Sequence, residues 1–154
     1  MSDPSRTVRL QRVLRCPPDR LYRAFIDPKA LVKWMAPHGF VSEVHSMDAK
    51  VGGGYRMSFT NFNTGQTHSF GGTYVEMRPN ELIRYTDTFD DSNLPGEMQM
   101  TVKLRAVTEA PGAALTELTI VQENLPAGIP IEFCYMGWQE SLELLTRLVE
   151  AEIP

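Results

Sequence analysis

Apolar and polar residues alternate along much of this chain with the two-residue period of a β-strand. The clearest segment is residues 97–107, where Met98, Met100, Val102 and Leu104 alternate with polar neighbours. Seven segments predict strands, at residues 7–14, 40–48, 54–62, 67–78, 81–90, 97–107 and 114–123. Because the alternation leaves one side polar, we expect the sheet to be covered on one face only.

Turn-forming residues separate the six strands that we expect between residues 40 and 123. They occur as GGG at 52–54, NTG at 63–65, RPNE at 78–81, SNLPGE at 92–97 and EAPGA at 109–113. These connections carry no helical pattern, so strands that follow one another should pair as antiparallel hairpins.

Helical periodicity is found on both sides of these six strands. Residues 17–27 and 28–35 each carry a short apolar stripe, and Asp27 is placed to cap the second helix ahead of Pro28. Residues 131–150 carry a longer stripe that includes Trp138, with charged residues on the opposite side. This last helix should supply the cover for the apolar face of the sheet.

These elements together predict an α+β domain with the helix-grip arrangement. A seven-stranded curved antiparallel sheet should carry two short helices after its first strand and the long C-terminal helix across its concave face. A chain of 154 residues fits a single domain, 1–154. Residues 1–6 and 152–154 lie outside the periodic segments, and we expect them to be loose ends.

Charge and composition narrow the choice of partners. The chain has 15 Lys and Arg against 19 Asp and Glu, and its basic residues are scattered, which argues against nucleic-acid binding. No run approaches the roughly 20 apolar residues of a spanning helix, so no membrane partner is expected. The two cysteines and the lack of a leader-like N-terminus favour a cytoplasmic location.

Four motifs occur in a characteristic order along the chain. They are WMAP after the second helix, VGGGYRM at the start of a strand, GGTYVEMRPNELIRYTDTF across a hairpin, and GWQESLELLTRLVE at the end. Over about residues 7–150 the sequence resembles the START-like (SRPBCC) superfamily, in the branch similar to the activator of the Hsp90 ATPase. The resemblance implies a cavity between sheet and terminal helix, which in various relatives holds hydrophobic compounds.

Asp87 is the most informative polar residue. In residues 81–90 it shares its side of the strand with Ile83, Tyr85 and Phe89, the more apolar set, so it should face the interior. The similar position in the resembling family is often aromatic. A buried carboxylate needs a partner, so Asp87 either hydrogen-bonds a ligand or exchanges protons through a raised pKa. The alternative is a carboxylate near the strand end that water or a neighbouring residue satisfies.

The remaining reactive side chains give weaker signals. His38 follows the second helix, where it either lines the mouth of a pocket as an acid or base, or caps the helix and meets solvent. His45 and His68 lie on different strands, and Cys134 is isolated from any base. We therefore predict no catalytic residue, no metal and no cofactor.

The function predicted from these patterns is binding of a small hydrophobic or aromatic molecule in the cavity, with a dry, packed core as the other interpretation of the same stripe. Trp138 should lie along the roof, and methionines suit an adaptable apolar lining. The candidate ligand-binding residues are Trp34, His38, Met57, Phe59, Tyr85, Asp87, Phe89, Met98, Met100, Tyr135, Trp138 and Leu142.

Two other functions stay open. The resemblance also implies an enzyme like the polyketide cyclases or aromatases, which would use acid and base groups in the cavity. A role as a partner of an Hsp90-type chaperone is the third, although the full activator carries a further N-terminal domain for which 154 residues leave no room. The sequence is compatible with a monomer or a homodimer.

Overall fold

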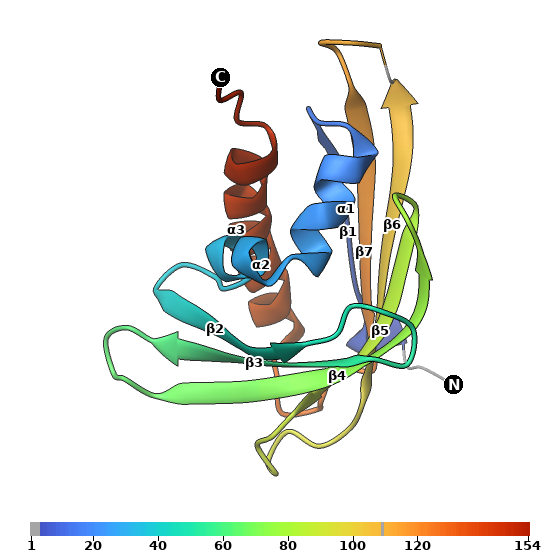
Figure 1. The fold of residues 1–154 in the computed structure, drawn as a ribbon. Helices are drawn as coiled ribbons and strands as arrows, with labels where there is room; N and C mark the ends of the chain where they lie inside the picture. The colour runs from blue at the N-terminus through green and yellow to red at the C-terminus, as the bar shows by residue number, and fades with distance from the viewer. Residues whose placement is uncertain (1–3, 109) are drawn as a thin grey trace.

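The seven predicted strands form one antiparallel sheet in the computed structural model, which describes residues 4–108 and 110–154 (Figure 1). Their order across the sheet is β1-β7-β6-β5-β4-β3-β2, so consecutive strands from β2 to β7 are hairpin neighbours and β1 closes the far edge against β7. The strands are β1 Val8–Leu14, β2 Phe40–Met47, β3 Gly54–Asn61, β4 Thr67–Arg78, β5 Leu82–Phe89, β6 Met98–Thr108 and β7 Leu115–Glu123.

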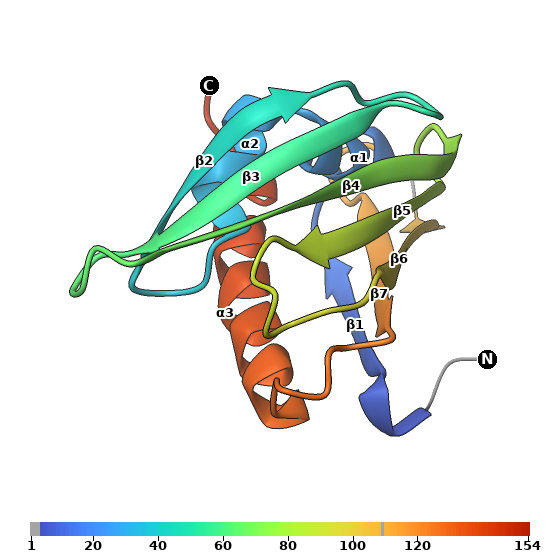
Figure 2. The ribbon, with the colours of Figure 1, turned by 90° about the horizontal axis from the view of Figure 1, so that it is seen from below.

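Three α-helices lie on one side of this sheet. They are α1 Pro18–Ile26, α2 Pro28–Trp34 and α3 Ile131–Val149. Figure 2 shows strands β2 to β5 arching over α3, which runs along the inner side of the curved sheet. The predicted α+β class and helix-grip arrangement are therefore confirmed, with element ends within two residues of those expected.

Register shifts and close backbone contacts accompany the curvature of the sheet. The pairing shifts by one residue between Val44 and Ser46 in β2 and between Tyr74 and Glu76 in β4. Such bulges bend a strand and increase its twist. At Gly72 a Cβ atom would lie 1.8 Å from the carbonyl oxygen of Thr86, so only glycine lets β4 approach β5 this closely.

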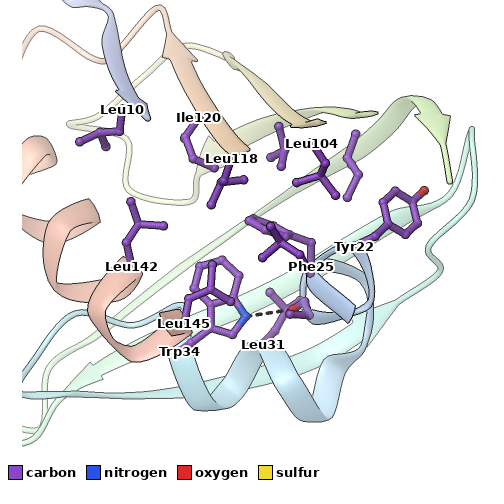
Figure 3. Close-up of a cluster of buried hydrophobic side chains, with 14 of the residues drawn as sticks. Leu10, Tyr22, Phe25, Leu31, Trp34, Leu104, Leu118, Ile120, Leu142 and Leu145 are labelled. Atoms are coloured by element: carbon purple, nitrogen blue, oxygen red, sulfur yellow. Dashed lines mark hydrogen bonds between the residues drawn. The ribbon is translucent and has the colours of Figure 1, made fainter. Parts of the chain in front are cut away.

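Trp34 joins the two short helices to the core. It is fully buried, and its indole Nε1 donates a hydrogen bond of 2.9 Å to the carbonyl of Ala24 (Figure 3). In a continuous helix that carbonyl would accept from residue 28, but Pro28 has no N–H. The indole therefore satisfies the carbonyl that the α1–α2 junction leaves open, while its ring packs edge-on against Phe25.

The C-terminal half of α3 seals this core. Leu142, Leu145 and Val149 are all buried, and Figure 3 shows Leu142 and Leu145 directed toward Leu10 and Leu118 of the sheet and Trp34 of α2. These large side chains leave the helix and sheet closely packed at this end of the molecule.

The N-terminal segment corrects one expectation. We expected residues 1–6 to be loose, but Pro4–Arg6 forms a 3₁₀ turn whose Arg6 guanidinium donates to the carbonyls of Leu125, Pro126 and Ile129. Residues 1–3 lie outside the described residues. Within the described part of the chain, no helix is long and apolar enough to cross a membrane.

Replacement of Trp34 should destabilise the fold strongly. Trp34→Ala removes the largest fully buried side chain and should lower the free energy of unfolding by about 3–5 kcal/mol. Trp34→Phe keeps a ring but leaves the Ala24 carbonyl without its donor, which costs about 1–3 kcal/mol.

Urea denaturation followed by circular dichroism measures both changes. Phe133→Ala is the matched control, because Phe133 is 68% exposed and its truncation should change stability by no more than about 0.5 kcal/mol. Equal effects of Trp34→Ala and Phe133→Ala would contradict the role assigned to the indole.

Candidate ligand-binding cavity

A partly enclosed cavity of about 180 Å³ lies between the inner face of the sheet and the N-terminal half of α3. Strands β3, β4 and β5 provide most of its aromatic wall, and the segment from α1 to the end of α2 closes one side. The lining residues are Phe25, Leu31, Met35, Pro37, Tyr55, Met57, Phe59, Phe70, Tyr74, Ile83, Tyr85, Asp87, Phe89, Met100, Gln122, Cys134, Gly137, Trp138 and Ser141.

Small side chains on α3 explain why this space is open. Cys134, Gly137 and Ser141 follow one another at spacings of three and four residues, so they share the helix face that lines the cavity. A Cβ atom added at Gly137 would meet no atom within 4 Å. Beyond Ser141, Leu142 and Leu145 are buried in the core and do not line the cavity, so the cavity ends where these large side chains begin.

Trp138 forms part of the cavity wall and joins α3 to the sheet. Its indole Nε1 donates to Oε1 of Gln122 on β7 at 2.8 Å, and Nε2 of Gln122 donates to the sulfur of Met98 at 3.3 Å. The chain of two hydrogen bonds satisfies the polar atoms of a buried amide and fixes the indole plane. The helix is thereby held to the sheet at the level of the cavity.

The opposite wall is a group of aromatic rings in contact with one another. Phe70 meets Phe59 edge-on, with ring centroids 4.8 Å apart, and lies 6.3 Å from Phe89. Tyr55 and Tyr85 are also perpendicular, with centroids 5.6 Å apart. Edge-to-face pairs of this kind hold rings in defined orientations, which gives the cavity a rigid apolar surface.

Asp87 is the one carboxylate on this wall among the described residues. Its Oδ1 accepts a hydrogen bond of 2.7 Å from the hydroxyl of Tyr55. Desolvation by burial raises the pKa of Asp87 from 3.8 to about 7, against the opposing effects of Tyr55, the Thr88 backbone amide and the charge of Arg56. The side chain borders the cavity, but protein surrounds it on its other sides, so desolvation has the largest effect.

The predicted candidate residues fall into two groups. Met57, Phe59, Tyr85, Asp87, Phe89, Met100 and Trp138 lie together on the cavity wall. The other five lie elsewhere. Trp34 and Leu142 are packed in the core, and the sulfur of Met98 accepts a hydrogen bond from Gln122. The hydroxyl of Tyr135 accepts a hydrogen bond from the backbone amide of Arg9, and His38 is exposed. Nδ1 of His38 lies 3.9 Å from Oε2 of Glu140 on the surface.

Several wall residues were not among the candidates. Tyr55 shares the alternation of Met57 and Phe59, and Gln122 shares that of Ile120, so the strand period alone could have identified both. Gly137 and Ser141 gave no such signal, because large apolar residues mark the buried stripe of a helix and these two residues are small or polar.

Metal ligands do not gather in the part of the chain that the structure describes: no three His, Cys, Asp or Glu side chains form a group that would hold an ion. Nε2 of His45 hydrogen-bonds the Ser58 hydroxyl at 2.9 Å. Burial raises the pKa of the Cys16 thiol to about 11, so that side chain stays protonated near neutral pH.

Asp87 gives the free energy of unfolding a specific pH dependence. Its pKa is about 7 in the folded protein and lies near the reference value of 3.8 when the chain is unfolded. Between these values the folded state holds a proton that the unfolded state has released, so stability should fall as the pH rises. This fall in the free energy of unfolding is at most about 1.4 kcal/mol per pH unit, and the free energy should level off above pH 7.

Comparison with Asp87→Asn isolates this contribution from that of other groups. The amide keeps an oxygen for Tyr55 but does not titrate, so the variant should gain stability relative to the original protein as the pH rises from about 4 to about 7. Urea denaturation at a series of pH values measures the difference. Parallel stability profiles would show that the Asp87 carboxyl is not desolvated as described.

Comparisons with known proteins bear on both the fold and this site. The model of the family described as "Activator of Hsp90 ATPase homolog 1-like protein" matches residues 15–150. Among solved structures, protein CV1439 from Chromobacterium violaceum is 53% identical, with a TM-score of 0.90, over 96% of this chain and 99% of that one. A search of curated proteins gave no match.

More distant structures share the architecture. Protein Ms6760 from Mycobacterium smegmatis is 19% identical with a TM-score of 0.75, over 97% of this chain and 94% of that one, and shows the fold alone. PFC0360w from Plasmodium falciparum, described as an HSP90 activator, is 25% identical with a TM-score of 0.67, over 92% of this chain and 94% of that one. With a family model matched over most of its length, the chain belongs to the Activator of Hsp90 ATPase homolog 1-like family of the START-like (SRPBCC) superfamily.

Proposed function

We propose that this protein binds a small hydrophobic or aromatic molecule in the cavity beneath α3. The family fold is consistent with a ligand-binding domain. The observation that carries the proposal is the cavity itself. Its described lining has an apolar wall of aromatic rings and methionines, a single carboxylate, and a helix cover made of small residues and Trp138. Such a combination of apolar walls with few polar groups is typical of small-molecule sites.

The cavity volume limits the size of the ligand. A cavity of about 150 Å³ in a protein core accommodates benzene, and sites for drug-sized ligands occupy about 300–1,000 Å³. A volume of about 180 Å³ therefore suits one ring with a short substituent. Larger ligands would require α3 or the α2–β2 connection to move.

Apolar burial would provide most of the affinity. A single aromatic ring buries on the order of 150–250 Å², which corresponds to about 4–6 kcal/mol at about 25 cal/mol per Å². Loss of translational and rotational freedom reduces the net value. We accordingly expect dissociation constants between micromolar and millimolar for simple one-ring probes.

Filling the cavity from α3 should abolish binding without unfolding the protein. In Gly137→Leu the new side chain extends from the middle of the lining face into the open space, so calorimetric titration with 2-phenylethanol should show a loss of affinity of at least about ten-fold.

Gly137→Ala is the matched control, because it adds one methyl group and improves helix propensity by about 1 kcal/mol, yet leaves most of the cavity open. Its affinity for 2-phenylethanol should stay within about three-fold of that of the unmodified protein. Undiminished binding in Gly137→Leu would place the probe outside this cavity and contradict the proposal.

Asp87 supports a second candidate, an acid–base enzyme similar to the polyketide cyclases or aromatases. A carboxyl whose pKa is about 7 exchanges protons readily at neutral pH, and it borders the cavity. Turnover of a bound carbonyl compound that disappears in Asp87→Asn, with binding retained, would distinguish this function from binding alone.

The similarity to the Plasmodium HSP90 activator supports a third candidate, a chaperone partner. That function would appear as stoichiometric binding to an Hsp90-type chaperone and stimulation of the chaperone's ATPase. If the cavity has no part in chaperone binding, Gly137→Leu would leave this binding intact.

A further inference from the structure

We propose that the molecule held in this cavity is a one-ring amine, bound as its ammonium ion with Asp87 as the counter-ion. This inference rests on the proposed function and adds the chemical class of the ligand. It follows from the distribution of charge around the cavity, the contacts that hold Asp87, and the size of the space.

The cavity wall carries one acidic group and, among the described residues, no basic group. Asp87 is an acid, while no Lys, Arg or His occurs among the described lining residues. The faces of the surrounding rings are themselves electron-rich and attract cations, with tryptophan the most effective. A ligand carboxylate or phosphate would face this wall without a cationic partner, whereas an ammonium group would meet both a carboxylate and aromatic faces.

The groups that pack around Asp87 leave its ionised form without a cation inside the cavity. Tyr55 from β3 donates a hydrogen bond, and Tyr85 lies on the same strand as Asp87. The residue that pairs with Asp87 on β6 is Met98, and Met100 of the same strand borders the cavity. Tyr74 from β4, whose ring packs against that of Tyr85, is a further neutral hydroxyl, because burial raises its pKa well above the ordinary value.

Within the described residues, the remaining elements that line the cavity supply no such cation either. Gln122 of β7 and Trp138 of α3 are neutral, and Cys134 of α3 has its pKa raised by burial. Arg56 is the nearby cation, but its guanidinium pairs with Asp90 on the exposed side of the sheet. Asp87 is half-buried but strongly desolvated. A desolvated carboxylate is costly without a charged partner, and a ligand ammonium would complete the pair.

Asp87 is also positioned to accept a further hydrogen bond. Its Oδ1 is held by Tyr55 at 2.7 Å, and the Thr88 backbone amide provides a second donor. An ionised carboxylate offers about four acceptor sites, so these two contacts orient the group without exhausting it. An ammonium ion provides three donors and no acceptor, which complements the unused sites.

The size of the cavity selects the rest of the ligand. About 180 Å³ holds one ring and a short chain. With the ammonium at Asp87, the ring would lie against Phe70, Phe89 and Trp138, and it would not need to enter the packed core beyond Leu142. 2-Phenylethylamine has these dimensions and is a suitable probe.

The affinity for such an amine should depend on pH in a defined direction. In the empty protein the pKa of Asp87 is about 7, so the carboxyl is largely protonated at pH 6 and largely ionised at pH 8. An alkylammonium group keeps its charge over this range, since it titrates near about 10. The amine should therefore bind more tightly as the pH rises from 6 to 8, and binding should lower the pKa of Asp87 in return.

Calorimetric titrations with three matched probes test the inference. They are 2-phenylethylamine, the neutral 2-phenylethanol and the anionic phenylacetate, each measured at pH 6 and pH 8. At pH 8 the amine should bind at least about ten-fold more tightly than the alcohol, and phenylacetate should bind weakest. In Asp87→Asn the ratio of amine to alcohol affinity should fall to about one, while Asp91→Asn, in the exposed loop after β5, should preserve it.

The outcomes separate this inference from the proposed function. If the alcohol binds as tightly as the amine at pH 8, or phenylacetate binds best, the amine assignment is overturned while small-molecule binding stands. If none of the three probes binds, both are overturned. Thermal unfolding of Asp87→Asn, followed by circular dichroism, establishes that a lost preference does not reflect a lost fold.

Discussion

The placement of α3 above the sheet is the constraint on which the rest of this structure depends. The helix is fixed in its C-terminal half by Leu142, Leu145 and Val149, which are buried in the core, and in its N-terminal half by the hydrogen bond from Trp138 to Gln122. Between the helix and the sheet, Cys134, Gly137 and Ser141 are too small to reach the opposite wall. The two attachments keep the helix from collapsing onto the aromatic rings, and the small residues leave the space beneath it open.

The same arrangement gives Asp87 its unusual environment. A carboxylate on the inner face of a tightly packed sheet would have to be neutral or paired with a cation. Here it borders a cavity, with Tyr55 and a backbone amide as donors. The cavity therefore allows Asp87 to lie on the inner face, and it leaves the charge of the ionised carboxylate without a cationic partner. The proposed amine site is thus a consequence of how α3 packs on the sheet.

The sequence predicted most of the architecture because strand and helix periods depend on local residue patterns. The alternation at Met98–Leu104 gave the face of β6, and the parity of residues 83, 85, 87 and 89 placed Asp87 on the inner side, where it lies. Periodicity was less informative about the cavity. It showed which face of α3 is turned inward, but it did not show where along the helix axis the core ends and the cavity begins, so Leu142 was grouped with Trp138.

The missing information is three-dimensional. Whether His38 reaches the cavity depends on the path of the α2–β2 connection. Whether Tyr135 reaches it depends on how α3 is rotated against β1. Diffraction from crystals under xenon pressure tests the central claim most directly, because xenon enters apolar cavities that are empty of side chains. The account predicts a xenon peak bounded by Trp138, Phe70 and Met100. A map without xenon there, in which side chains fill the space beneath α3, would contradict it.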